Sequence, residues 1–241
     1  MEYLFLALLF IIAFLYSSVG HGGASGYLAL MALFDMAHVI MKPSALSLNI
    51  FVAGIAFFAF YRAGYFRWRL AWPFLITSVP MAFIGALLPV NGNLYEIILG
   101  IFLLIAVARI LFSPSALTDK PTLPPIAAAV ITGALLGFFS GMTGIGGGII
   151  LSPLLILFHW STVKESAAVS SLFILLNSAS GLMATLIDGF RFNPQIILWI
   201  GIGISGALAG SYIGSKKLKQ GKLKYILAAI LFMASVKLII F

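Results

Sequence analysis

The sequence predicts an all-α integral membrane protein built from two related halves. Of its 241 residues, 62% are hydrophobic and 8% are charged, the mean hydropathy is +1.16, and several apolar runs are long enough to span a bilayer. Glycine-rich polar breaks interrupt the apolar sequence at two corresponding places, a pattern typical of transporters with broken helices. We therefore expect two inverted repeats, each with a Gly-tipped re-entrant helix hairpin and three transmembrane spans.

The composition also excludes several classes of protein. The net charge of +8 comes from Lys and Arg in short loops beside the spans, so it indicates membrane topology rather than nucleic-acid binding. The absence of cysteine excludes disulfides and thiolate metal ligands. The first apolar run, Glu2 to Leu15, lacks a basic n-region and a small-residue cleavage site, so we expect it in the mature protein. We expect no cofactor and no metal site.

The first half is expected to occupy residues 1–112. Its hairpin, over 1–34, is broken at Ser17–Gly26, and a leg of about 15 residues reaches only roughly 22 Å, short of a hydrocarbon core of about 30 Å. Three spans are expected at 43–61, 70–88 and 94–112. A linker over residues 113–125, which contains four prolines, separates the halves.

The second half repeats this order over residues 126–241. Its hairpin, 126–158, is broken by the segment Gly137–Pro153, and its spans are expected at 165–187, 194–214 and 223–241. The glycines of the two breaks align at a constant offset of 124 residues, since 144 − 20 = 124. This offset pairs Gly20, Gly22 and Gly23 with Gly144, Gly146 and Gly147.

Loop charge indicates that the halves lie in opposite orientations. The loop 62–69 carries three arginines and its successor 89–93 is neutral, whereas loop 188–191 has one arginine and its successor 215–224 has five lysines. Under the positive-inside rule, the loops 62–69 and 215–224 and the linker are cytoplasmic, and both termini are outside. Each half then crosses an odd number of times, three if the hairpin returns to its own side or five if it crosses fully.

The two breaks supply the candidate binding site. Each starts a half-helix, near Ala24 and near Gly148, and a helix N-terminus carries partial positive charge and free N–H groups that suit an oxyanion. The candidate anion ligands at the tips are Gly20, His21, Gly22, Gly23 and Ser25 in the first half and Thr143, Gly144, Gly146, Gly147 and Gly148 in the second. Polar residues near the starts of the next spans are further candidates, namely Ser47, Asn49, Ser171 and Asn177.

Structural explanations stay open for all of these residues. Close helix packing explains the glycines, and interhelical hydrogen bonding explains the span residues. His21, the ionisable residue at the tips, either contacts the substrate or a proton, or is a hydrogen-bonded buried group. The six acidic residues fall near segment ends or in loops. Since no nucleophile with a base and no metal cluster is evident, we do not expect an enzyme; a carrier and an anion channel remain alternatives.

The strongest motif is Gly-x-x-Gly-x-Gly-Gly-Gly-x-Ile-x-x-Pro-Leu-Leu, at Gly141 to Leu155, with a related Gly-His-Gly-Gly segment at Gly20–Gly23. Over nearly the whole chain the sequence resembles the sulfite exporter TauE/SafE family of membrane permeases. The resemblance implies transport of small sulfur-containing anions, such as sulfite or organosulfonates, across a bacterial or archaeal cell membrane. The particular anion, the direction, the coupling ion and the oligomeric state, including a homodimer, stay open.

Overall fold

The structure, a computed structural model, describes residues 2–88, 121–187 and 194–240 and four single positions between 104 and 111. Its described helices are α1 (Glu2–Ser18), α2 (Ala24–Leu33), α3 (His38–Arg62), α4 (Trp68–Ala86), α6 (Ile126–Thr143), α7 (Gly148–Leu157), α8 (Val163–Ile187), α9 (Ile196–Tyr212), the π-helix η2 (Ile213–Lys217) and α10 (Gln220–Ile240). Within the described chain, five helices are long and apolar enough to cross a membrane. The predicted all-α integral membrane fold is thus confirmed. The span expected at 94–112, the loops 89–93 and 188–191 and most of the linker lie outside the described residues.

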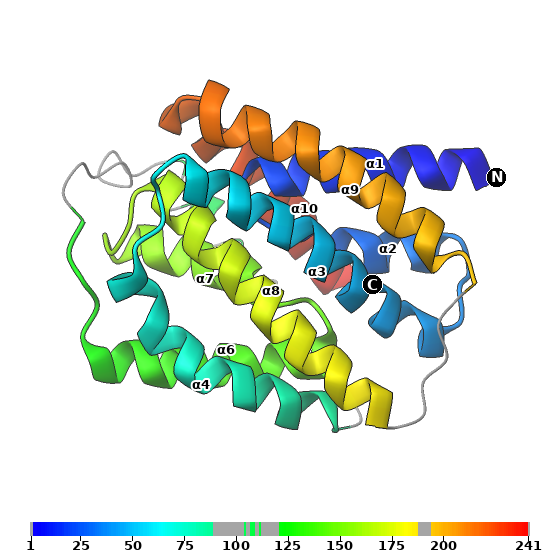
Figure 1. The fold of residues 1–241 in the computed structure, drawn as a ribbon, viewed down its shortest axis with the longest axis horizontal. Helices are drawn as coiled ribbons and strands as arrows, with labels where there is room; N and C mark the ends of the chain where they lie inside the picture. The colour runs from blue at the N-terminus through cyan, green and yellow to red at the C-terminus, as the bar shows by residue number, and fades with distance from the viewer. Residues whose placement is uncertain are drawn as a thin grey trace.

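Two pairs of helices, α1 with α2 and α6 with α7, flank the polar breaks. In the second pair, α6 has 18 residues and is one of the five helices long enough to cross a membrane. The first leg α1 has 17 residues, whereas α2 and α7 have ten each, which correspond to about 25 Å and about 15 Å of helix. All three are shorter than a hydrocarbon core of about 30 Å. In Figure 1, α1 begins at the right end of the molecule and α6 begins at the left end. The two helix pairs therefore enter from opposite ends.

Two long helices, α3 and α8, pass through the centre and pack against each other (Figure 1). Each has 25 residues, about 37 Å of helix, and each buries a phenylalanine completely, Phe60 on α3 and Phe173 on α8. The helix α3 begins at His38, five residues before the expected start at Pro43 (43 − 38 = 5). The proline consequently lies inside the helix, near its start, where it removes one backbone hydrogen bond.

The outer helices contact helices of the other half of the chain. In these contacts α4 packs along α6, and α9 packs along α1. Glycine makes both contacts: a Cβ atom built at Gly85 would overlap the carbonyl oxygen of Phe138, and one at Gly210 would overlap that of Phe14. Backbones that approach this closely leave no room for a side chain, as in other small-residue packing of membrane helices. These contacts fix α6 against α4 and α1 against α9, so each helix pair beside a break packs on a helix of the other half.

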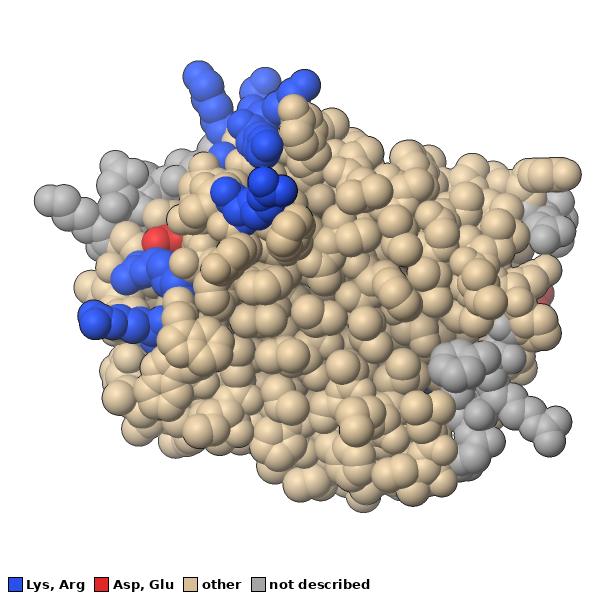
Figure 2. All heavy atoms as spheres, in the orientation of Figure 1, with Lys and Arg blue, Asp and Glu red and all other residues tan. Residues whose placement is uncertain are grey.

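Most Lys and Arg side chains visible in Figure 2 gather at one end of the molecule, on the left. Lys42 lies at the other end, where its Nζ donates to Ala86 O at 3.3 Å. Lys164, at the start of α8, joins two loops at the basic end, because its Nζ donates to Tyr65 Oη and to the Ser215 carbonyl oxygen, each at 3.1 Å. The end of the linker lies at the same end, where Thr122 N donates to His159 O at 3.0 Å. The two basic loops and the linker, all expected in the cytoplasm, therefore lie at the same end of the molecule. That this end faces the cytoplasm stays a prediction.

Candidate functional site

One side chain of α3 joins both polar breaks. Asn49 is fully buried, and its Oδ1 accepts a hydrogen bond from Ala24 N, the first residue of α2, at 3.0 Å. Its Nδ2 donates to Ile145 O, in the second break, at 3.4 Å and to Ser178 Oγ on α8 at 3.2 Å. Asn49 thus fixes the start of α2 and the loop before α7 to the two central helices.

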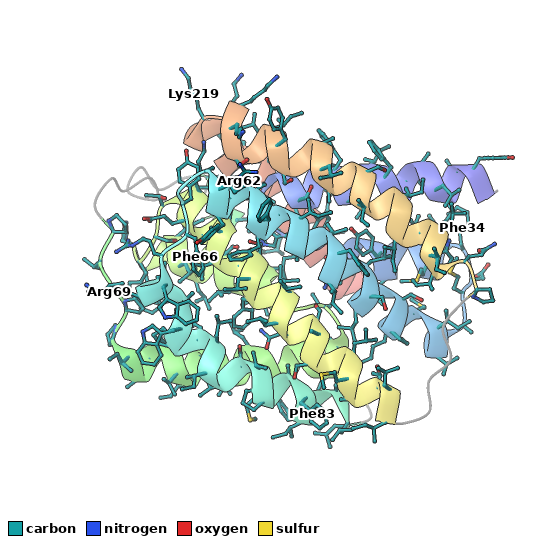
Figure 3. The ribbon with its side chains drawn as sticks, in the orientation of Figure 1. Phe34, Arg62, Phe66, Arg69, Phe83 and Lys219 are labelled. Atoms are coloured by element: carbon teal, nitrogen blue, oxygen red, sulfur yellow. The ribbon has the colours of Figure 1, made fainter. Side chains whose placement is uncertain are left out.

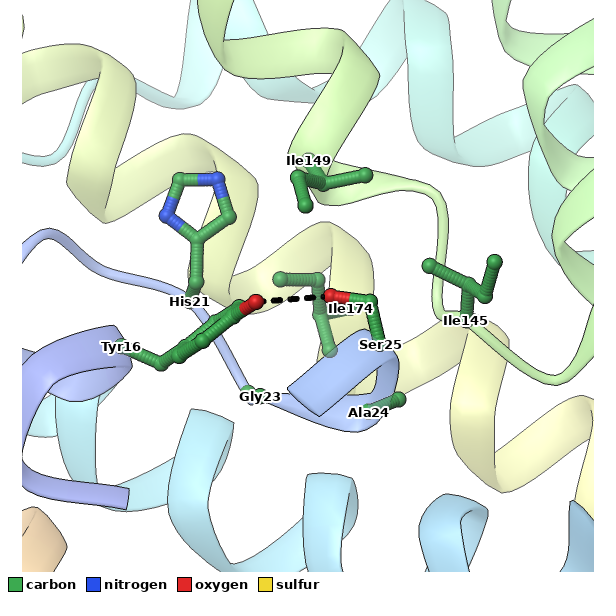
Figure 4. Close-up of a pocket in the computed structure, with 9 residues that line it drawn as sticks. Tyr16, His21, Gly23, Ala24, Ser25, Ile145, Ile149 and Ile174 are labelled. Carbon is green, nitrogen blue, oxygen red and sulfur yellow. Dashed lines mark hydrogen bonds between the residues drawn. The ribbon is translucent and has the colours of Figure 1, made fainter. Parts of the chain in front are cut away.

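A small cavity lies between the breaks (Figure 4). It measures about 10 Å³, room for about one water molecule. Its lining residues come from α1, the first break, the start of α2, the second break, α7 and α8: Tyr16, His21, Gly22, Gly23, Ala24, Ser25, Ile145, Ile149 and Ile174. The polar groups all come from the first helix pair, and three isoleucines form the opposite wall.

Two hydroxyl groups form a hydrogen bond across the cavity, shown dashed in Figure 4. The Tyr16 Oη and Ser25 Oγ atoms lie 2.8 Å apart, and either can donate. Tyr16 stands near the end of α1 and Ser25 in the first turn of α2. The bond therefore ties the two legs of the first helix pair together beside the break.

His21 brings an unpartnered polar atom to the cavity. It is 1% exposed, and its Nδ1 lies 3.1 Å from Val19 O, which can only accept, so Nδ1 carries the proton. Its Nε2 forms no hydrogen bond with any residue that the structure describes, although the ring approaches the Gly148 backbone at the start of α7. A buried polar atom without a well-formed hydrogen bond is costly, which makes this nitrogen a candidate ligand contact.

Two of the candidate glycines approach Asn49 closely. A Cβ atom at Gly22 would overlap the Asn49 amide, and one at Gly146 would lie 2.7 Å from Asn49 Nδ2. Gly146 also has a φ of +86°, a conformation that is strained for other residues. Both glycines let the breaks close around Asn49, and Gly22 also lines the cavity.

The other tip glycines differ in their surroundings. Gly23 lines the cavity, next to the Tyr27 ring. A side chain at any of the remaining four would meet protein atoms: Gly20 faces the Ala167 backbone, Gly144 the Lys42 side chain, Gly147 the Phe173 ring and Gly148 the Ile174 side chain. Close packing is a sufficient reason for these four glycines, whereas Gly22 and Gly23 also face the cavity.

The remaining polar candidates bond to carbonyl oxygens of their own helices. The donors and acceptors are Ser47 and Pro43 at 2.8 Å, Thr143 and Phe139 at 2.8 Å, Ser171 and Ala168 at 2.9 Å, and Asn177 and Phe173 at 2.8 Å. These four side chains lie outside the group that lines the cavity. The structure thus brings together His21, Gly22, Gly23 and Ser25, with Asn49 against the break.

Sequence reasoning missed Tyr16, the three isoleucines and Ser178. An isoleucine in an apolar helix carries no signal that it faces a cavity. Tyr16 did carry one, because a phenol directly before a polar break places a hydroxyl at the end of an otherwise apolar leg. Ser178, beside Asn177, could be found only from the packing of α3 against α8.

An all-helical chain with several membrane-spanning helices and a buried polar cavity between two broken helix pairs has the architecture of a multi-pass membrane transporter. The chain matches the sulfite exporter TauE/SafE family over residues 4–238 and belongs to that family. The resemblance noted from the motifs is thereby confirmed, as is the prediction of a multi-pass membrane protein.

The similar curated proteins are named as probable membrane transporters. The chain is 36% identical over 235 residues to the probable membrane transporter protein y4hK of Sinorhizobium fredii, with 95% of each chain covered. It is 24% identical over 226 residues to the probable membrane transporter protein YdhB of Bacillus subtilis, with 88% of this chain and 89% of that protein covered. No solved structure matches the chain.

Proposed function

We propose that this transporter carries small sulfur-containing anions, such as sulfite or organosulfonates, held between the N-terminal ends of α2 and α7. The observation that carries the proposal is the cavity where His21 and Ser25 meet beside both helix starts. The partial positive charge of a helix N-terminus favours an anion there. Membership of a sulfite exporter family supports sulfur oxyanions as the substrate class.

The side chains at the cavity have complementary roles in this proposal. With its proton on Nδ1, His21 offers Nε2 as an acceptor to the O–H of a protonated oxyanion. Ser25 supplies a hydroxyl donor once its bond to Tyr16 is exchanged. The anion is thereby recognised without a fixed positive side chain.

We further propose that the two halves are inverted repeats with re-entrant hairpins at α1–α2 and α6–α7. The helix starts Ala24 and Gly148 support this, being 148 − 24 = 124 positions apart. The glycine contacts support it too. Gly85 packs on Phe138 and Gly210 packs on Phe14. The glycines are 210 − 85 = 125 positions apart and their partners are 138 − 14 = 124 positions apart, so the two contacts correspond between the halves. The opposite entry of the two helix pairs in Figure 1 agrees with such inversion.

Substrate binding requires a rearrangement at the cavity. A space of about 10 Å³ suits one water, and a sulfite ion is larger. The hairpin tips must therefore part, with exchange of the Tyr16–Ser25 bond, before the anion enters. Movement of one hairpin at a time would open the site to one side of the membrane, which is alternating access.

The alternative function is an anion channel with the same two-tip site. Reconstituted protein separates the two: a carrier gives saturable counterflow of labelled anion, whereas a channel gives single-channel currents. Either result leaves the binding site in place.

Ligand-induced thermal shifts of the purified protein test the substrate class. Sulfite, an organosulfonate, sulfate and chloride are compared at equal concentration and ionic strength. A ligand at about 100 times its Kd stabilises the folded state by about 2.7 kcal/mol, so a sulfite or sulfonate that binds raises the melting temperature in a saturable way. Equal shifts with all four anions, or none with any sulfur anion, would contradict the proposal.

A further inference from the structure

A second cavity lies at the basic end, between the last turns of α3 and the last turns of α9. Its volume is about 360 Å³. Aliphatic and aromatic side chains form its wall, among them Ile55, Phe58 and Leu208, while Arg62 and Lys216 bring positive charge to it. Figure 3 labels Arg62 at the end of α3, and Figure 2 shows basic side chains over the same region. This cavity is separate from the one between the two breaks.

The two basic side chains stand over aromatic rings, and neither has an acidic partner among the residues that the structure describes. The Arg62 guanidinium carbon lies 5.6 Å from the Phe58 ring centroid, and Lys216 Nζ lies 5.3 Å from that of Tyr212. Within the described chain, the single ion pair joins Arg67 to Glu165. The cations at the cavity therefore carry positive charge that a bound anion can complement.

A buried hydroxyl at the same cavity also has no partner in the described part of the chain. Ser215 is 2% exposed, and its Oγ forms no hydrogen bond among the described residues. It belongs to the π-helix η2, a wider turn that is often found at functional sites. The Ser215 carbonyl is fixed by Lys164 at 3.1 Å, so this turn is held in place while its hydroxyl can donate to a ligand.

We propose that this cavity binds one anionic phospholipid, with its phosphate at Arg62, Lys216 and Ser215 and its acyl chains along the apolar wall. Phe58 and Leu208 are 59% and 57% exposed on helices that are long enough to span the membrane, so the wall continues onto the lipid-facing surface. A small water-soluble anion has no apolar part that could pack against this wall. Basic pockets between transmembrane helices at the cytoplasmic side favour anionic headgroups.

The test measures binding of defined lipids to the full chain in detergent micelles. Native mass spectrometry counts bound molecules of dioleoyl phosphatidylglycerol, with dioleoyl phosphatidylcholine and sn-glycerol 3-phosphate as probes for charge and for the acyl chains. We expect one phosphatidylglycerol to bind at least about tenfold more tightly than either control. Glycerol phosphate that binds as tightly as the lipid would overturn the proposal in favour of a site for water-soluble anions.

Variants separate this site from general attraction to a basic surface. A basic side chain near an anionic headgroup contributes about 1 kcal/mol, so the double variant Arg62→Gln/Lys216→Gln should bind phosphatidylglycerol about 30-fold more weakly. The matched control Arg69→Gln/Lys219→Gln changes two exposed basic residues at the same end that do not line the cavity. It should lose less than about threefold. Equal losses in the two pairs would overturn the proposal.

A third variant tests the apolar wall without changing any charge. Ala59 lines the cavity, and Ala59→Phe fills part of it, so phosphatidylglycerol binding should be lost while sulfite thermal shifts persist. Unchanged lipid binding in a variant that melts like the wild type would also contradict the proposal. Because the two ligands are measured separately, failure of the lipid site leaves the proposed anion transport untouched, and the reverse holds as well.

Discussion

Replacement of Asn49 by alanine tests how the two breaks are held together. The change removes three hydrogen bonds from Asn49, to Ala24 N, Ile145 O and Ser178 Oγ. Each joins α3 to another element. Interhelical hydrogen bonds in membrane proteins contribute about 0.6 kcal/mol on average and up to about 1.7 kcal/mol. The three together amount to about 2–5 kcal/mol of the free energy of unfolding.

Asn177 provides the matched control. It is an asparagine on the other central helix, 1% exposed, and its one described hydrogen bond goes to Phe173 O within the same helix. Asn177→Ala removes the same atoms from a similarly buried place but breaks no bond between elements. Both variants lose the packing of the same side-chain atoms. Beyond that shared loss, we expect Asn177→Ala to lower the free energy of unfolding by less than about 1 kcal/mol.

Reversible unfolding in mixed detergent and dodecyl sulfate micelles measures both variants. The account predicts a midpoint for Asn49→Ala well below that of Asn177→Ala, with the helical content of the folded state unchanged. If the two variants lose equal stability, Asn49 does not bridge the breaks, and the geometry described for the cavity is wrong.

Two further predictions concern topology and packing. In this cysteine-free chain, Arg69→Cys and Lys219→Cys should both resist an impermeant thiol reagent added to intact cells and both react after permeabilisation; labelling of either from outside would refute the opposed orientation of the halves. Gly141→Val should destabilise the protein by about 3 kcal/mol, because a Cβ atom there overlaps the Ala82 carbonyl, whereas Gly201→Ala, with open space around it, should be neutral or stabilise by up to about 1 kcal/mol. A thermal melt of both glycine variants checks this, and similar losses in the two would contradict the close contact of α4 with α6.

The sequence located the helix starts at the tips because clustered glycines with Ser and Thr interrupt otherwise continuous apolar helices. Ala24 and Gly148 begin α2 and α7 where the half-helices were expected to begin. Asn49 was selected as a polar residue in an apolar span, but its role depends on contacts with Ile145 and Ser178, which lie 96 and 129 positions away. Local patterns contain no information about such distant partners.

The residues that line the two cavities were harder to predict from the sequence. Ile149 and Ile174 look like any other apolar helix residues, so nothing marked them as one wall of the central cavity. Ser215 and Lys216 were expected in a basic loop, whereas the structure places them in a π-helix that continues α9. A π turn differs from an α turn by one extra residue, and no composition rule detects it.

The tip glycines are poor sites at which to test anion binding. Valine at Gly22 or Gly146 would collide with Asn49, and Gly146 also has a positive φ. Such variants would lose stability whether or not the tips bind an anion. A side chain that faces the cavity, and whose removal leaves the backbone undisturbed, gives a clearer result.

The most direct test of anion binding between the tips is therefore the affinity of purified Ser25→Ala for sulfite, with Ser47→Ala as its control. Both serines are buried, but Ser25 lines the cavity while Ser47 donates to Pro43 O in its own helix. A hydrogen bond to a charged group contributes about 1.5–3 kcal/mol, so isothermal titration should show Ser25→Ala binding sulfite about ten- to a hundredfold more weakly. Ser47→Ala should stay within about twofold of the wild type. Unchanged sulfite affinity in a well-folded Ser25→Ala would contradict the proposal that the anion sits between the two helix starts.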